Sequence, residues 1–141
     1  MADEVKRLEY YSAVIANKPG EGARVLAALR DEGVNFIGLN GYPIGNPLKA
    51  KKTTVDFVPS DAKVFKKAAR KIGLEIGGKL PCIFVNGEDR QGMGAEILAR
   101  LGAAGINVIA MHMVCAGAGR VGAMLFVEAP LASKAAKVLS K

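Results

Sequence analysis

Two patterns of apolar residues alternate along the chain, one with the period of a strand and one with the period of a helix. In the first half they predict a strand, a helix, two strands, a helix and a short last strand, at residues 8–16, 22–32, 34–42, 53–58, 61–72 and 74–76. In the second half they predict the same order without the last strand, at residues 80–86, 92–104, 106–116, 120–127 and 130–139. The order βαββαβ is that of a ferredoxin-like unit, so we expect an α+β protein with antiparallel sheets and helices on one face.

The two halves are copies of one another. A shift of 72 positions aligns Asn17–Ile37 with Asp89–Ile109 without a gap, and 9 of the 21 aligned residues are identical. Further along, Phe57-Val58 matches Phe126-Val127 at a shift of 69, which predicts three extra residues between the second and third strands of the first copy. A repeat of this length predicts two units in tandem, which we expect at residues 1–77 and 78–141.

The second copy ends before it can form its own fourth strand, because the counterpart of residues 74–76 would lie beyond Lys141. An uncovered strand edge promotes aggregation, so another segment is expected to pair with it. Two segments are possible, the N-terminal residues or a second chain. The strands are also apolar on both faces, as in Val108–Cys115, which predicts extensive contact between copies or between chains.

Composition and charge exclude several classes of protein. The 141 residues are 50% hydrophobic and 23% charged, which is typical of a globular protein. The net charge of +7 permits an anionic partner without requiring one. Two cysteines, together with acidic residues at positions 3 and 4 where a signal peptide needs basic ones, favour a cytoplasmic protein. Residues 101–119 carry no charge, but their four glycines, Asn107 and His112 argue against a membrane span.

The sequence offers little for catalysis, and we expect no enzyme activity, no cofactor and no metal. It has one histidine and no nucleophile elbow, phosphate-binding loop or zinc-binding helix motif. The run Met111–Cys115 resembles a site for a soft metal, but strand alternation separates His112 from the sulfur residues. Packing in a buried strand is the favoured interpretation of these residues.

A glycine-rich turn precedes the first helix of each copy. The turns are Pro19–Ala23 and Gln91–Ala95. A helix start has free amide groups and a partial positive charge, and glycines let a carboxylate approach them. An asparagine follows 15 residues after the first glycine of each turn, at Asn35 and Asn107, and its amide can both donate and accept. These residues can hold an amino acid, or they can simply shape tight turns; the pattern leaves both possibilities open.

Basic residues gather on the second predicted helix and in the loop before it. They are Lys49, Lys51, Lys52, Lys63, Lys66, Lys67, Arg70 and Lys71. A nucleic-acid-binding module of ferredoxin-like fold is therefore an alternative function. No aromatic residue is interleaved with these charges and no RNA-binding signature occurs in the strands, so a solvated helix face is the favoured interpretation.

The repeated segments resemble the signature of the ACT domain. The resemblance lies in Asn17-Lys18-Pro19-Gly20 and Gly33–Ile37, and again in Asp89–Gly92 and Gly105–Ile109, and it extends over nearly the whole chain. The chain looks like a stand-alone tandem ACT protein with no enzyme attached. This resemblance implies a regulatory protein, probable homodimerisation, an amino acid bound between paired domains, and an enzyme or regulator as partner.

The resemblance also implies a set of ligand-binding residues. In serine-sensing members, an asparagine before Pro-Gly and another opening the second strand contact the effector, and Asn17 and Asn35 occupy these positions. The implied set is Asn17, Gly20, Glu21, Gly22, Ala23, Asn35, Phe36, Ile37, Asp89, Gly92, Met93, Gly94 and Asn107. The second copy departs from the pattern at Asp89 and Gln91, so the first copy is expected to be the working site. A strand-end histidine of some serine sensors is replaced by Ile15 and Gly87, so serine itself is not predicted.

Overall fold

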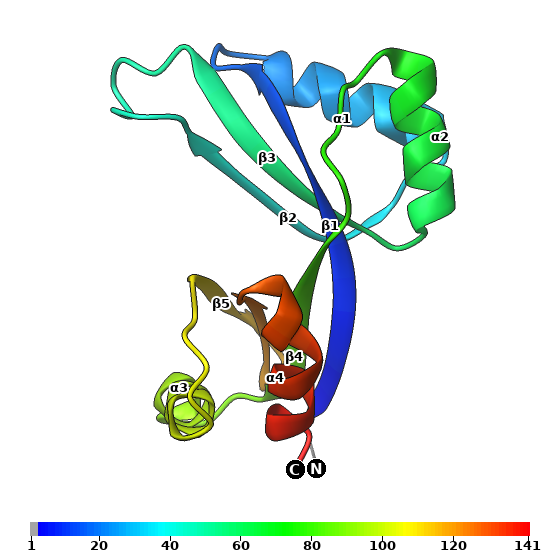
Figure 1. Cartoon of the computed structure of the whole chain (residues 1–141). Coiled ribbons are helices and arrows are strands. Elements are labelled where there is room, and N and C mark those ends of the chain that lie inside the picture. Colours follow the sequence, from blue (N-terminus) through cyan, green and yellow to red (C-terminus); the bar gives the residue numbers. More distant parts are fainter. Residues whose placement is uncertain (1–2) are drawn as a thin grey trace. The chain divides into compact units, whose positions relative to one another are not determined.

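The computed structural model describes residues 3–141, which form two compact units (Figure 1). The first unit comprises residues 9–79, and the second comprises residues 3–8 together with residues 80–141. The sequence placed the domain boundary at 77/78, whereas the compact units assign the N-terminal residues to the second half of the chain. Met1 and Ala2, on which the expectation about the start of the chain partly rests, lie outside the described residues.

The first unit is a sheet covered by two helices on one face (Figure 1). Its elements are the second part of β1 (Glu4–Ala16), α1 (Glu21–Asp31), β2 (Phe36–Pro43), β3 (Lys52–Pro59) and α2 (Ala62–Ile72). β3 lies between β1 and β2 and pairs antiparallel with both. Residues 74–76 do not form the expected strand. The segment nevertheless follows β1, because the amide of Gly77 donates to the carbonyl of Ser12 at 2.9 Å.

The second unit repeats this arrangement. Its elements are β4 (Leu80–Glu88), α3 (Met93–Ala103), β5 (Ala110–Gly117), β6 (Arg120–Phe126), a 3-10 turn (Ala129–Leu131) and α4 (Ala132–Leu139). β6 pairs antiparallel with β4 and β5, and β1 is the hydrogen-bonded neighbour of β4 on the other side. The first residues of β1 therefore supply the missing fourth strand. Of the two segments expected at this edge, the structure shows the N-terminal one.

The prediction of an α+β protein with two ferredoxin-like units is confirmed, and each unit has its own core. In the first unit, Phe57 and Phe65 are fully buried and their ring centroids lie 5.3 Å apart. In the second, Ile83, Leu101 and Leu125 are fully buried. Each such side chain contributes about 1.5–3 kcal/mol relative to an exposed one.

The start of α2 is set by a side-chain cap, whereas α1 and α3 start without one. The carboxylate of Asp61 accepts from the amides of Lys63 and Val64 at 2.9 and 3.2 Å. α1 instead starts after Gly20, whose φ of 87° is left-handed, and α3 starts after Gly92 with a φ of 83°. Glycine adopts this conformation without strain. The first turns of α1 and α3 are thus free of a capping side chain.

Strand register corrects the alignment of the third strands. Tyr11 pairs with Phe57, while its counterpart Ile83 pairs with Leu125, so the third strands are related by 68 positions and not by 69. The identity of Phe57 with Phe126 is misleading, because a slip of one residue moves a side chain to the other face of the sheet. The first unit therefore has four extra residues between its second and third strands. The second strands keep the shift of 72, since Leu39 pairs with Phe57 and Met111 with Leu125.

Residues 101–119, uncharged throughout, are divided between the end of α3, a turn and β5. Among residues 3–141, no helix is both long enough and apolar enough to cross a membrane.

Candidate functional site

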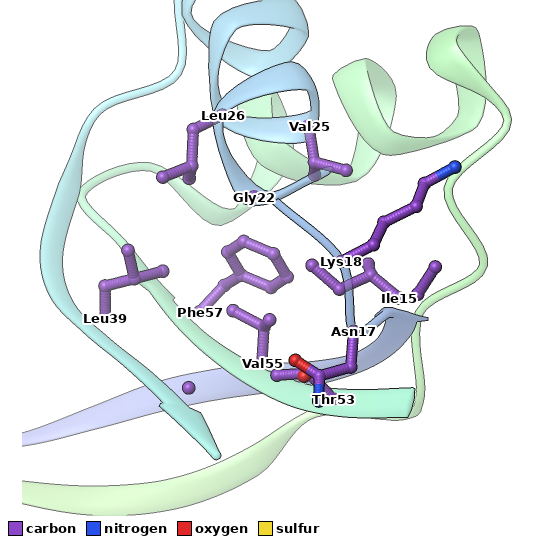
Figure 2. Close-up of a pocket in the computed structure, with 12 residues that line it drawn as sticks. Ile15, Asn17, Lys18, Gly22, Val25, Leu26, Leu39, Thr53, Val55 and Phe57 are labelled. Carbon is purple, nitrogen blue, oxygen red and sulfur yellow. The ribbon is translucent and has the colours of Figure 1, made fainter. Parts of the chain in front are cut away.

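The first unit has a cavity of about 300 Å³ between the start of α1 and the sheet (Figure 2). It lies where β1 ends and the glycine-rich turn begins. Its lining comes from β1, α1, β2 and β3, and comprises Ile15, Ala16, Asn17, Lys18, Gly22, Val25, Leu26, Leu39, Gly41, Thr53, Val55 and Phe57. The volume is at the lower end of small-molecule sites.

Most of the cavity wall is aliphatic or aromatic. Figure 2 shows Leu26 and Val25 of α1 above the ring of Phe57, with Leu39 on one side and Ile15 on the other. Asn17 and Thr53 lie next to one another at one end of the cavity, near Val55. The side chain of Lys18 extends away from Leu39. The cavity therefore has a large apolar part and one polar end, the combination typical of sites for small molecules.

Asn17, at the polar end, is held in place by the β2–β3 loop. Its Nδ2 donates to the carbonyl of Ala50 at 2.8 Å, and its backbone amide donates to the carbonyl of Lys51 at 2.9 Å. These two bonds fix the side chain with its amide nitrogen already committed. The side-chain oxygen is the group that remains to accept a hydrogen bond from a ligand.

The predicted turn residues Gly20, Glu21, Gly22 and Ala23 open α1, and Gly22 lines the cavity. Among the described residues, none accepts a hydrogen bond from the amides of Gly22 and Ala23. A side-chain methyl placed on Gly22 would meet nothing within 4 Å. Glu21 pairs with Arg24 at 2.5 Å, and the hydrogen bond from Arg24 lowers the pKa of the Glu21 carboxyl. The negative charge of the Glu21 carboxylate is thus paired with the guanidinium of Arg24.

Asn35, Phe36 and Ile37 are not brought to this cavity. Asn35 precedes β2, and its carbonyl accepts from the amide and hydroxyl of Ser60 at 2.9 and 3.1 Å. Asn17 is tied to the start of β3 and Asn35 to its end, and the eight residues of β3 span about 26 Å. Within one unit these two asparagines cannot contact the same small ligand. That they hold one ligand stays a prediction, and it requires Asn35 of another unit.

The corresponding turn of the second unit is filled by two methionines. Met113 occupies the position of Gly41, and its Cε lies 3.4 Å from the place where a Cβ on Gly94 would stand. Met93 occupies the position of Glu21, is 2% exposed, and lies 2.9 Å from the place of a Cβ on Gly87. Gly92 and Gly94 thus open a helix as predicted, but side chains of the unit itself lie against the turn.

The predicted polar residues of the second unit are also engaged or remote. The amide of Asp89 donates to the carbonyl of Gly119 at 2.8 Å, matching the Asn17 backbone bond in the first unit. Its carboxylate accepts a hydrogen bond from the Cys115 thiol, which raises the pKa of that thiol. Asn107 lies before β5, in the place that Asn35 has before β2.

Of the twelve lining residues, the sequence analysis named Asn17 and Gly22 as ligand-binding and missed the other ten, among them Leu39, Gly41 and Thr53. These last three lie on β2 and β3, where the repeats are less alike than in the helix. The shift of 72 positions does contain the signal, since it places Gly41 opposite Met113. The difference between Gly41 and Met113 becomes informative once the structure shows that both residues lie on the face of the sheet that the helices cover.

Other predicted chemistry is dispersed. Among the described residues, no three His, Cys, Asp or Glu side chains come together as metal ligands. His112 is exposed on β5, and its ring meets Phe126 edge-on at 6.3 Å. The basic residues of α2 face solvent; Lys71 pairs with Glu32 at 3.0 Å, and Lys66 lies 5.5 Å above the ring of Tyr11.

Comparison with known proteins defines the fold and not the family. No family model and no curated protein matches the sequence. Among solved structures, protein BT0572 from Bacteroides thetaiotaomicron is similar with a TM-score of 0.77 and 18% identity, over 96% of this chain and 88% of that one. The regulatory subunit of aspartate kinase from Thermus thermophilus, in ligand-free form, has a TM-score of 0.65 and 14% identity, over 99% and 95%. The same subunit from Thermus flavus has a TM-score of 0.58, with the same identity and coverage.

Regulatory subunits of an amino-acid-metabolising kinase are thus among the structures that share this tandem arrangement. At identities below 20% the likeness establishes the arrangement of helices and strands. It leaves the ligand and the partner to be argued from the residues of this chain.

Proposed function

We propose that this chain is a non-catalytic regulatory protein of the ACT type, with ACT domains at 1–77 and 78–141, that senses a small amino acid at an interface between ACT domains. The observation that carries the proposal is the cavity beside Asn17, which combines an apolar wall, a free side-chain oxygen and unpaired amides at the start of α1. The ligand's ammonium group meets the oxygen of Asn17, and its carboxylate meets the amides of Gly22 and Ala23. The tandem fold shared with aspartate kinase regulatory subunits supports a regulatory role.

A homodimer completes the proposed site. β2 is the edge strand of the first unit, and it exposes Ile37, Leu39 and Tyr42, with Ile44 directly after it, by 44–49%. Antiparallel pairing of β2 with β2 of a second copy places the start of one strand beside the end of the other. Asn35 of the second copy then comes to the end of the sheet where Asn17 and the cavity lie, which removes the separation of about 26 Å found within one unit.

Regulation then follows from linkage. A ligand shared by two copies stabilises the paired arrangement, and it shifts the population by no more than the difference in its affinity for the two states. A partner enzyme or regulator in the cytoplasm reads the surface that changes.

The test is thermal unfolding of the full chain in the presence of each of the twenty amino acids. A ligand at 100 times its Kd adds about 2.7 kcal/mol of stability, which raises the Tm by several degrees. The variant Asn17→Ala should lose the shift. Its matched control is Asn46→Ala in the same loop, where the asparagine likewise holds a backbone group, the amide of Leu48 at 2.9 Å. If no amino acid raises the Tm, the proposed function is wrong.

The dimer has its own test. We expect twice the chain mass in light scattering after gel filtration, and a single-chain mass for Ile37→Asp on the β2 edge. The control is Leu48→Asp, since Leu48 is 94% exposed and lies in the loop outside the strand. A single-chain mass for the unmodified protein with and without ligand would overturn the pairing.

A further inference from the structure

The two units differ at a pair of positions that lie beside the turn before the first helix of each unit. Gly41 pairs with Val55 in the first unit, and Met113 pairs with Ala123 at the same place in the second. Both positions face the helix, because Gly41 lines the cavity below α1 and Met113 touches the first turn of α3 at Gly94. The first unit therefore has an empty space where the second unit has a side chain.

The neighbours of these two positions show that the difference is local. A Cβ built on Gly22 meets nothing within 4 Å, whereas a Cβ built on its counterpart Gly94 meets the Cε and Sδ of Met113 at 3.4 and 3.8 Å. A Cβ on Gly41 would meet only the carbonyl of Thr54, at 4.0 Å. Gly41 does not have a positive φ, so its backbone accepts any residue there without strain. The first unit thus has room for a methionine at Gly41 and does not carry one.

From this comparison we infer that the cavity of the first unit is the one ligand site of the chain, and that it takes a free amino acid whose apolar side chain is about the size of methionine or leucine. In the second unit, the thioether end of the half-exposed Met113 lies at the equivalent place beside the turn, which indicates the size of side chain that this place accepts. The wall agrees, because Val25, Leu26, Leu39, Val55 and Phe57 offer no polar group to a hydroxyl or a charge. This inference rests on the proposed function and specifies its ligand class.

Closure of the second turn by its own side chains is the other half of the inference. Met113 and the buried Met93 fill the place of a ligand side chain, and methionine adapts well to an irregular space. The carboxylate of Asp89 is occupied by the Cys115 thiol. In the second unit, the half-exposed Met113 and the buried Met93 thus stand beside the turn whose counterpart borders the cavity in the first unit.

Isothermal titration of the full chain tests both halves, using L-methionine, L-leucine and L-norleucine against L-serine, L-aspartate and L-lysine. We expect one equivalent of an apolar amino acid per chain, bound on the order of tenfold or more tighter than serine, because each buried methylene contributes to affinity. Tighter binding of serine, or two equivalents per chain, would overturn the inference and leave the proposed function standing. No binding of any amino acid would overturn both.

The variant Gly41→Met places in the first unit the side chain that fills the second, and it should weaken binding at least tenfold. The matched control is Leu48→Met, which adds the same side chain in the β2–β3 loop, where the residue is 94% exposed and does not line the cavity. Gly41→Ala, with a smaller group in the same place, should reduce affinity less than Gly41→Met. Unchanged affinity in a folded Gly41→Met protein would contradict the inference. If that variant fails to fold, the series of amino acids on the unmodified chain still decides.

Discussion

The hydroxyl of Ser12 donates a hydrogen bond of 2.6 Å to the carboxylate of Asp56, a residue only 6% exposed. The two lie opposite one another on β1 and β3, and Asn40 of β2 donates to the other carboxylate oxygen at 3.4 Å. A buried carboxylate is stable only when such donors replace water. This polar row therefore ties together the three strands of the first unit.

Removal of the hydroxyl tests that row. Ser12→Ala leaves one oxygen of Asp56 without its short donor, and it should reduce the free energy of unfolding by about 1–3 kcal/mol. Urea denaturation measures the change. Ser133→Ala on an exposed position of α4 is the control, with an expected change within about 0.5 kcal/mol. Equal midpoints for the two variants would show that the Asp56 bond contributes nothing.

Removal of residues 1–8 should damage the second unit selectively. Residues 4–8 of β1 lie beside β4, so a chain that begins at residue 9 exposes that strand's edge. Hydrogen exchange should show faster exchange for β4 amides than for β3 amides, relative to a chain that begins at residue 3. Equal protection of β4 in the two chains would mean that the N-terminal segment is dispensable.

The cap of α2 offers a prediction about a single side chain. Asp61→Ala removes the acceptor for the amides of Lys63 and Val64, and should lower the free energy of unfolding by about 0.5–2 kcal/mol. Asp61→Ser, which keeps a capping oxygen, should lose much less. Thermal denaturation of the two variants measures the difference. An equal loss of stability in Asp61→Ser and Asp61→Ala would contradict the prediction.

Thiol chemistry tests the contact between Asp89 and Cys115. The hydrogen bond to Asp89 raises the pKa of the Cys115 thiol, so less thiolate is present at pH 8 than for an ordinary cysteine. Asp89→Asn should lower this pKa towards its usual value and speed the reaction with a disulfide reagent. Cys82 is fully buried and contributes little to the reaction of the folded protein. Glu88→Gln removes a charge one residue away and serves as the control. An equal acceleration of the thiol reaction in Glu88→Gln would show that the loss of a negative charge, and not the loss of the hydrogen bond, is the cause.

The repeat made most of the fold predictable. The glycine-containing turns and the helix that follows match at a constant shift, because the same local geometry recurs in both units. Even the cover of the last strand edge could be narrowed to two segments. The predicted alignment of the third strands was wrong, because the identity of Phe57 with Phe126 was given more weight than the alternation of side chains between the two faces of the sheet. A single aromatic identity is a weak guide when a slip of one residue reverses the sheet.

The site was predicted less completely, for a physical reason. Sequence similarity marks the turns that both units share, whereas a cavity arises from what one unit lacks. Gly41 attracts no attention as one of 17 glycines, and Met113 reads as a core residue. The correspondence between Gly41 and Met113 becomes informative only in the structure, because their pairing with β3 and β6 places them beneath the first turns of α1 and α3. Asn17 was found from the sequence because its position in the turn is local.

The partition of β1 between the two units also affects the order of events during synthesis. The residues that pair with β4 leave the ribosome long before β4 itself, because the last residue of β4 follows Leu8 by 80 positions. At translation rates of about 5–20 residues per second, this N-terminal segment waits on the order of ten seconds for its neighbour. During that interval the nascent chain carries a strand segment that has no neighbouring strand. The charged residues Glu4, Lys6 and Arg7 keep this segment soluble.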